Sequence, residues 1–525
     1  MLKKYLKFSI FALFSIILFS CEQKEAITKP NIVFVIADQF RSMEMGCYGG
    51  TGVKTPNFDK LASEGVRFKH AISTAPICSP YRAMMLTGNY PVKNGMVTND
   101  HFMKNPTPYF AEACKAAGYK TAYVGKWHID GYSRTGYIPK DRRHGFDYWK
   151  VLECTHNYNS SSYYSQDEKT PRKWKGYDSV DQTRDACEYI KKQSGDEPFC
   201  LFLSWGPPHN PYYAPKKYMD QIKLKDIKLR KNVSDFPAAE KMYKESNFIL
   251  GGSYPKSRSV RLPFMLDKNN VEIRNWYKGY YAAIATLDDL FGQVIKTLKE
   301  NGKLDNTIIV FTSDHGDNLG SHRQHEKELP YEESISVPLI IRYPSKIKAG
   351  IETDALLSPI DIMPTLLSLA NIPCPLVDGK DLSGAAEGKN ENIRDAVLIM
   401  KASWLGSIYA TSGAGPWRGV RTKDYTYARK SDTKKPWLLF DNNKDPYQLN
   451  NLVDSVRYAD LVLKLDEKTN EMLIEANDPE DPVFFSKLIQ EERKQHGFME
   501  EKPGTFPTYV KPGSPFTKYL KNQKQ

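Results

Sequence analysis

The stretch NIVFVIAD, residues 31–38, carries an unbroken apolar run and ends in the carboxylate of Asp38. A run that is apolar at nearly every position is typical of a strand buried on both faces of a parallel sheet. Three further runs lead directly into polar side chains: residues 121–124 before Lys126 and His128, residues 199–205 before His209, and residues 306–313 before Asp314. Because ligands of open α/β sheets bind outside the carboxyl ends of the strands, these side chains are expected to converge on one site.

Helices are expected between the runs. Residues 55–66 begin with a Thr-Pro pair, which suits a helix start, and residues 275–300 repeat apolar side chains at helical spacing. Residues 360–371 form a third apolar helix. The sequence therefore predicts an α/β fold with a large, mostly parallel sheet sandwiched by helices.

The sequence pattern changes after residue 395, where we expect short strands and turns followed by a helix near residues 455–475. A chain of 525 residues is too long for one typical core. We therefore expect a catalytic domain at 21–395, a smaller C-terminal α+β domain with an antiparallel sheet at 396–490, and an extended Lys- and Pro-rich tail at 491–525.

Charge and cysteine usage restrict the function classes. The formal charge is 74 − 62 = +12, which favours an anionic partner without choosing between nucleic acid, anionic lipid and acidic polysaccharide. The eight cysteines contain no CxxC pair. Their spacing argues against a disulfide framework or a zinc–thiolate site.

The first 20 residues have the form of an export signal, with a lysine-rich start and an apolar run at residues 8–19. The segment LFSC, residues 18–21, resembles a bacterial lipoprotein signal. That resemblance implies a lipid anchor on Cys21 and an outer-membrane protein that faces the periplasm or the cell surface. The alternative is an ordinary signal peptide in which Cys21 is incidental.

The polar groups expected at the strand ends and in nearby motifs combine acids, cations, imidazoles and one thiol. They are Asp38, Gln39, Cys78, Arg82, Lys126, His128, His209, Asp314, His315 and Lys327. Such a set suits a hard cation together with a tetrahedral anion. Carboxylate and amide oxygens favour Ca²⁺, or less strongly Mg²⁺, although they do not exclude zinc.

The motif CSPYR, residues 78–82, followed by LTG at 86–88, resembles the signature of the type I sulfatases, in the alkaline-phosphatase-like superfamily. The five residues alone are a weak match. Seven further segments resemble the family and occur in its order: PNIVFVIADQ, TPNFDKLASEGVRF, AGYKTAYVGKWH, PPHNP, FTSDHGDNLGSH, YEESISVPLI and LFDNNKDPYQLNNL. The resemblance covers nearly the whole mature chain.

The resemblance implies that Cys78 is oxidised to formylglycine by a formylglycine-generating enzyme. The hydrated aldehyde then offers two hydroxyls. One attacks sulfur, and the other allows the sulfate ester to collapse back to the aldehyde, which a plain serine or cysteine cannot do. The implied activity is that of a sulfuric ester hydrolase.

The same resemblance implies that Asp38, Gln39, Asp314 and His315 are metal ligands. Two of them depart from the commonest pattern, which has a second aspartate in place of Gln39 and an asparagine in place of His315. Gln39 still offers a carbonyl oxygen. His315 offers nitrogen, which suits Ca²⁺ less well, so it is either a ligand or a contact to the sulfate; its simplest alternative is a turn residue.

The remaining roles also follow from the resemblance. Arg82 holds the hydrated nucleophile, and Lys126 and Lys327 bind sulfate oxygens. His128 bonds the diol and assists the elimination as a base. His209 contacts the sulfate and protonates the leaving oxygen, a role that Lys327 could share.

Two segments outside the motifs are expected to recognise the substrate: residues 154–178, rich in aromatic and basic side chains, and the basic segment 212–274. They favour a sulfated polysaccharide, either an algal cell-wall polysaccharide such as ulvan or a glycosaminoglycan, and no nucleic acid. The alternatives are a phosphodiesterase or phosphonate monoester hydrolase of the same superfamily, and a non-catalytic glycan-binding lipoprotein.

Overall fold

The structure is a computed structural model that describes residues 29–495 with several gaps. The gaps are residues 105–106, 132, 196, 235–270, 325, 390–392, 404, 408–409 and 412–414. The signal segment and Cys21 lie outside the described residues, as do most of the basic segment 212–274 and the tail beyond residue 495.

An eleven-stranded sheet forms the centre of the molecule, in the order β11-β2-β10-β8-β1-β7-β3-β4-β5-β6, with β9 paired to β2. Its middle consists of four adjacent parallel strands: β8 (Thr307–Ser313), β1 (Asn31–Asp38), β7 (Phe199–Pro208) and β3 (Lys120–Lys126). They are the four apolar runs that the sequence identified. The prediction of a buried parallel sheet is confirmed.

The flanks of the sheet mix directions, because β10 is antiparallel to both β8 and β2, and β5 is antiparallel to β4. The flanking strands are β2 (Val66–Ile72), β4 (Tyr148–Leu152), β5 (Ser162–Ser165), β6 (Arg172–Lys173), β9 (Ser336–Val337), β10 (Leu339–Arg342) and β11 (Ile351–Leu357).

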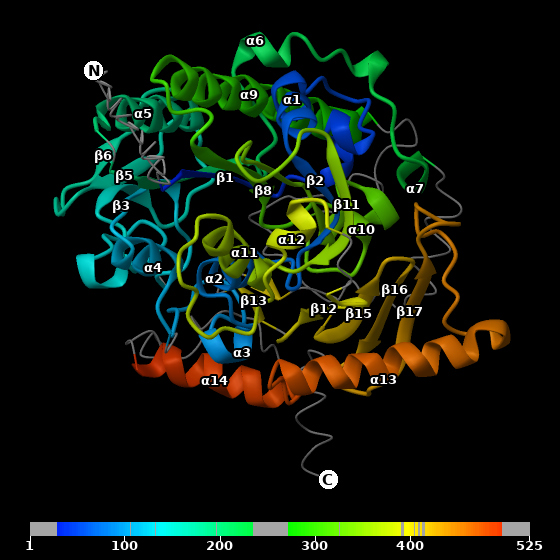
Figure 1. Ribbon diagram of the computed structural model, residues 1–525. Coiled ribbons are helices and arrows are strands. Elements are labelled where there is room, and N and C mark those ends of the chain that lie inside the picture. Colours follow the sequence, from blue (N-terminus) through cyan, green and yellow to red (C-terminus); the bar gives the residue numbers. More distant parts are fainter. Residues whose placement is uncertain are drawn as a thin grey trace, which may run out of the picture.

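Helices cover both faces of the sheet (Figure 1). One face carries α1 (Pro56–Glu64), α5 (Asp178–Lys192) and α9 (Val271–Glu300); the other carries α2 (Cys78–Thr87), α4 (Phe110–Ala116), α11 (Ile362–Leu369) and α12 (Ser383–Ala386). Alternate residues of β1 belong to the two cores, Val33 and Val35 to the first and Ile32, Phe34 and Ile36 to the second. This explains why β1 has no polar alternation.

Shorter helices lie in the connections. They are α3 (Pro91–Asn94), α6 (Lys216–Met219), α7 (Lys231–Ser234) and α10 (Glu332–Ile335). Among the described residues, no helix is both long and apolar enough to cross a membrane. The seven cysteines in the described part of the chain are free thiols.

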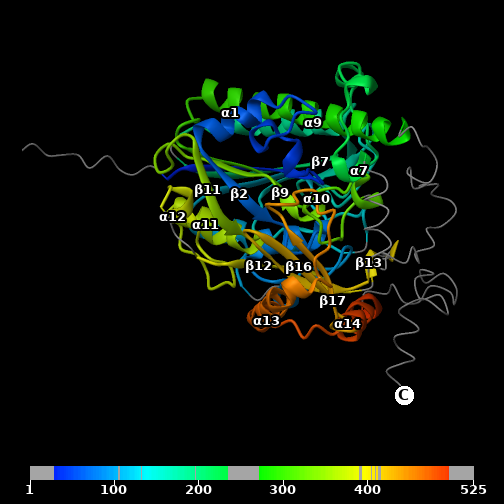
Figure 2. The ribbon, with the colours of Figure 1, turned by 90° about the vertical axis from the view of Figure 1, so that its right-hand side faces the viewer.

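The C-terminal part contains a four-stranded antiparallel sheet of β12 (Ala396–Lys401), β15 (Trp417–Thr422), β16 (Tyr425–Lys430) and β17 (Pro436–Asp441). Two short strands, β13 (Leu405–Ser407) and β14 (Ala410–Thr411), pair separately. Helices α13 (Ala459–Glu475) and α14 (Pro482–Gln495) lie on the outer side of the four-stranded sheet (Figure 2). The expected antiparallel sheet and the helix near 455–475 are confirmed.

The expected extended tail is wrong at its start, because α14 continues to Gln495. Phe485 and Ile489 of this helix are completely buried in the core that α13 shares with the four-stranded sheet. Composition suggested a solvated tail from residue 491, but the two buried side chains dock the helix on the sheet.

A buried ion pair joins this sheet to the segment between its two helices. Arg418 of β15 donates from Nε to Oδ2 of Asp478 at 2.6 Å, and both side chains are completely buried. Arg418→Met is expected to lower the free energy of unfolding by about 3–5 kcal/mol, because Asp478 would remain buried without its partner. Urea denaturation followed by circular dichroism measures this loss.

The matched control is Lys216→Met, which breaks an exposed ion pair with Asp220 and is expected to leave the denaturation midpoint unchanged. Equal midpoints for the two variants would show that the Arg418–Asp478 pair does not hold the C-terminal sheet together.

Candidate active site

Two carboxylates lie at the same edge of the central sheet. Asp38 ends β1, and Asp314 follows the adjacent parallel strand β8. The backbone N–H of Gln39 donates to Oδ1 of Asp314 at 3.0 Å, which fixes the two strand ends together. Gln39 has a φ of 68°, a left-handed conformation that is strained for a residue other than glycine and is often found at functional sites.

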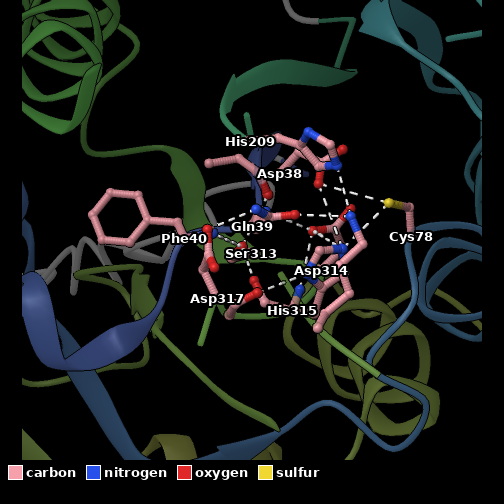
Figure 3. Close-up of polar contacts among 12 residues, drawn as sticks. Asp38, Gln39, Phe40, Cys78, His209, Ser313, Asp314, His315 and Asp317 are labelled. Atoms are coloured by element: carbon pink, nitrogen blue, oxygen red, sulfur yellow. Dashed lines mark hydrogen bonds and ion pairs between the residues drawn. The ribbon is translucent and has the colours of Figure 1, made fainter. Parts of the chain in front are cut away.

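The thiol of Cys78 faces these carboxylates from the first residue of α2 (Figure 3). Its Sγ lies 3.7 Å from Oδ1 of Asp38 and 3.2 Å from Nε2 of His315. Burial and Asp38 raise the pKa of Cys78, but the charges of Lys126, Lys327 and His315 outweigh them and lower that pKa to about 5. The pocket therefore stabilises a negative charge at position 78.

The donor atoms of Asp38, Cys78, Asp314 and His315 all lie within 4.8 Å of one another, and all four residues are buried. His315 places Nδ1 2.9 Å from the carbonyl of Gly316, and its Nε2 lies 3.5 Å from Oδ1 of Asp38 and 3.6 Å from Oδ1 of Asp314, where a bound cation would displace its proton. Two carboxylates and an imidazole are a common donor set for a divalent cation.

Two cations balance the two carboxylates. Nε and Nη2 of Arg82 each lie 3.0 Å from Oδ2 of Asp314. Nη1 of the same side chain donates to Oγ of Ser204 at 2.7 Å. The ammonium of Lys126 contacts Oδ2 of Asp38. Burial alone would raise the pKa of Asp38, but the charge of Lys126, with smaller effects from His315 and Arg82, holds it well below its usual range. Asp38 is therefore held in the ionised form that binds a cation.

Gln39 differs from the other expected ligands in the direction of its side chain. Its Oε1 accepts a hydrogen bond from Nζ of Lys327 at 2.8 Å, and its Nε2 donates to Oδ2 of Asp317 at 2.7 Å. The amide thus joins the lysine of the site to a buried acid that the sequence analysis did not single out.

His209 and Lys327 form a second pair in the site. Nζ of Lys327 lies 2.6 Å from Nε2 of His209, and Nδ1 of His209 faces the carbonyl of Asn210 at 2.8 Å. Burial, and then the charge of Lys327, hold the pKa of His209 well below its usual value. Burial lowers the pKa of Lys327 as well, but nearby Cys78, Glu326 and Asp38 outweigh it and raise that pKa. The pair therefore consists of a neutral imidazole and a charged ammonium.

His128 lies deep in the site and has a φ of 62°. Its Nε2 is 3.5 Å from Oδ1 of Asp100, which Arg134 holds through two hydrogen bonds of 2.9 Å. Burial lowers the pKa of His128, but Cys154 and Asp100 outweigh it and raise that pKa well above its usual value. This direction favours the protonated imidazole, which lies beside the carboxylate of Asp100.

Sequence reasoning missed Asp100, Arg134, Cys154 and Asp317. Cys154 lies just beyond the end of β4, so the strand-end rule that found Asp38 would also have found it. Asp100 and Arg134 lie in loops that do not continue a strand of the sheet, and only the fold brings them to His128.

Two of the aromatic side chains of segment 154–178 belong to the buried interior, whereas Tyr163 and Tyr164 are partly exposed, so the prediction that this segment recognises the substrate stays a prediction. Trp174 is 2% exposed and Tyr158 is 1% exposed. Tyr158 instead donates from its hydroxyl to the carbonyl of His209 at 2.8 Å. The segment contacts the site through His156, whose ring is stacked on His209 with centroids 4.2 Å apart.

The family model described as "Sulfatase" matches residues 30–372, and the model described as "N-sulphoglucosamine sulphohydrolase, C-terminal" matches residues 320–475. An ulvan-active sulfatase of Formosa agariphila is 38% identical over 92% of this chain and 88% of its own length.

Two solved structures are similar in fold. One, a complex with its substrate D-glucosamine-2-N,6-O-disulfate, has a TM-score of 0.73 and 26% identity and covers 86% of this chain and 99% of its own. The other, a phosphonate monoester hydrolase of Agrobacterium radiobacter, has a TM-score of 0.68 and 23% identity. It covers 85% of this chain and 96% of its own.

Calcium added to chelator-treated protein is expected to raise the melting temperature, because the donor set of Asp38, Asp314 and His315 exists only in the folded state. A ligand present at about 100 times its Kd stabilises such a state by about 2.7 kcal/mol. Differential scanning calorimetry measures the shift over a calcium titration.

In Asp314→Asn the calcium-induced shift should shrink or vanish, whereas in Asp220→Asn, at an exposed acid, it should match the native protein. Equal shifts in all three proteins would place the bound calcium elsewhere.

Proposed function

This chain belongs to the sulfatase family, and we propose that it hydrolyses the sulfate esters of ulvan or of ulvan oligosaccharides. The observation that carries the proposal is the pocket at Cys78, where a buried position that favours negative charge faces two carboxylates and several cations. Such a pocket can bind a cation and a tetrahedral anion next to the nucleophile at position 78.

The choice of a sulfated carbohydrate is supported by the similar proteins and by charge. The Formosa agariphila relative is ulvan-active and matches nearly the whole chain, and the similar substrate complex contains a sulfated amino sugar. A net charge of +12 suits a polyanionic substrate. We propose ulvan rather than a glycosaminoglycan as the substrate, because the ulvan-active relative is more similar in sequence than the protein of the substrate complex.

We assign Ca²⁺ to the cation position, held by Asp38, Asp314, His315 and the modified Cys78. Oxygen donors predominate in this set, which favours Ca²⁺. A bound cation would supply positive charge to the site. The hydrate of formylglycine at position 78 would supply one hydroxyl that attacks sulfur and expels the sugar alcohol, and a second that re-forms the aldehyde as sulfate leaves.

The residues of the chain itself supply charge and protons. Lys126 keeps Asp38 ionised, and Arg82 pairs with Asp314, so both carboxylates are held in place for a cation. Lys327 carries the proton that the neutral His209 lacks, and we therefore assign protonation of the leaving oxygen to Lys327. His209 then orients the lysine and accepts its hydrogen bond between turnovers.

Maturation and location complete the proposal. Oxidation of Cys78 requires a formylglycine-generating enzyme in the host. Lipidation of Cys21 would anchor the enzyme to the outer membrane, facing the periplasm or the cell surface, where large algal polysaccharides or their fragments are accessible. The resemblance of residues 18–21 to a lipoprotein signal supports this location.

Purified enzyme, matured with a formylglycine-generating enzyme and supplied with Ca²⁺, is expected to release sulfate from ulvan oligosaccharides, as measured by ion chromatography. Cys78→Ala should release none. Activity confined to small aryl or choline sulfates would contradict the carbohydrate assignment. Faster turnover of matched phosphate diesters or phosphonates would favour the phosphonate monoester hydrolase alternative, whose fold this chain shares.

The assignment of Lys327 as the acid makes a separate prediction. Lys327→Met is expected to slow the hydrolysis of a sugar sulfate by about 10²- to 10⁴-fold, the usual contribution of a general acid. An aryl sulfate, whose leaving group needs no proton, should be affected much less. Steady-state kinetics on both substrates measure the difference, and an equal loss on the two would show that Lys327 is not the acid.

A further inference from the structure

His156 is a partly exposed histidine beside the site, and the chemistry proposed above gives it no role. Its ring stacks on that of His209, with an interplanar angle of 6° and centroids 4.2 Å apart. Nε2 of His156 lies 4.0 Å from Sγ of Cys154, and the described residues provide no hydrogen-bond partner for Nδ1. One edge of this imidazole is therefore open to a ligand.

The sheet explains why His156 lies at the site. Strand β4 is parallel to β3, with Leu152 opposite Lys126, and the backbone N–H of Trp127 donates to the carbonyl of Leu152 at 2.9 Å. The residues that follow these two strands therefore emerge together at the carboxyl edge of the sheet, where ligands of such sheets bind. His156 is the fourth residue after the end of β4.

The loop that carries His156 is held on both sides of it. The backbone N–H of Cys154 donates to the carbonyl of Arg134 at 2.9 Å, and the hydroxyl of Tyr158 donates to the carbonyl of His209 at 2.8 Å. Cys154 and Tyr158 are both buried, whereas His156 between them is partly exposed. The loop thus presents the imidazole in a fixed position without burying it.

Exposure along the site indicates where the sugar of the substrate lies. Cys78 and the two carboxylates are buried, whereas Lys327 is partly exposed. With Lys327 as the acid that protonates the leaving oxygen, the sulfate lies deep and the sugar on that oxygen extends outwards from the lysine. Nζ of Lys327 is 2.6 Å from Nε2 of His209, on which His156 stacks. His156 therefore lies next to the sugar.

The groups at this mouth favour a neutral hydroxyl as the partner of His156. A neutral imidazole has one donor and one acceptor nitrogen, and a hydroxyl pairs with either. Glu326, the neighbour of Lys327, accepts a hydrogen bond of 3.1 Å from Nδ2 of Asn210, the neighbour of His209. A carboxylate held at this place repels a second anionic group on the sugar.

We propose that His156 is a specificity-determining residue that hydrogen-bonds a hydroxyl of the sulfated sugar, on a carbon next to the sulfate ester. Such a hydroxyl is the sugar group closest to the leaving oxygen. The alternative is a structural role, in which the ring only covers one face of His209. The inference rests on the proposed function, because it requires a sulfated sugar as the substrate.

The test compares sugars that differ by one hydroxyl. The probes are methyl α-rhamnoside 3-sulfate, which has a hydroxyl on each carbon next to the ester, and its 2-deoxy and 4-deoxy analogues. The mature native enzyme should prefer the parent sugar to one of the analogues in kcat/KM by about 3- to 10-fold, the usual net effect of one neutral hydrogen bond. His156→Phe keeps a flat ring against His209 but has no ring nitrogen, so it should lose this preference.

Two controls separate recognition from structure. Tyr158→Phe removes the hydroxyl that holds the carbonyl of His209, so it should lower kcat/KM on all three sugars by one common factor and keep the preference. An aryl sulfate has no sugar hydroxyl, so any loss that His156→Phe shows on it measures the structural effect alone. His156→Gln, which keeps an N–H and a carbonyl at this position, should retain part of the preference.

A preference that is unchanged in His156→Phe would overturn the inference and leave His156 as a cover for His209. A loss in His156→Phe of the same size on the three sugars and on the aryl sulfate would do the same, as would a native enzyme that does not distinguish the three sugars. A native enzyme that releases no sulfate from any sugar, ulvan oligosaccharides included, would instead contradict the proposed function, and the inference would fall with it.

Discussion

The ion pairs of Asp38 with Lys126 and of Asp314 with Arg82 are the interactions on which the site depends. Two unit charges roughly 4 Å apart repel by about 4 kcal/mol at an effective dielectric constant near 20, and burial adds a desolvation cost. Adjacent parallel strands bring the two acids to one edge of the sheet, so the repulsion follows from the fold itself. The two buried cations offset this repulsion, and a divalent cation would complete the charge balance.

The C-terminal sheet takes part in this arrangement through the residue next to Lys327. The backbone carbonyl of Glu328 accepts a hydrogen bond from Nε1 of Trp417 at 3.0 Å, and its carboxylate pairs with Lys401 at 3.0 Å. Both partners lie on strands of the four-stranded sheet. The smaller sheet therefore helps to position a proposed catalytic lysine. The two parts also share buried apolar cores.

Sequence patterns were sufficient for the parts of the site that lie on regular elements. Continuous apolar runs predicted the central strands, and the polar residues that follow them, such as Asp38 and Asp314, meet as expected because parallel strands end at one edge. Patterns failed where contacts join distant loops. Asp100 and Asp317 act on His128 and Gln39 through side-chain hydrogen bonds that have no periodic signal. Composition alone also did not predict that Trp174 is buried. An aromatic side chain in a basic loop can lie in the core or on the surface, and tertiary packing determines which.

The central claim is that the charge balance of this pocket serves a modified Cys78. The measurement that tests it most directly is mass spectrometry of the peptide that contains Cys78, isolated from protein made in its native host. The account predicts that the thiol is replaced by the aldehyde of formylglycine. A plain thiol throughout would contradict it, because the pocket would then lack the nucleophile that the proposed hydrolysis requires.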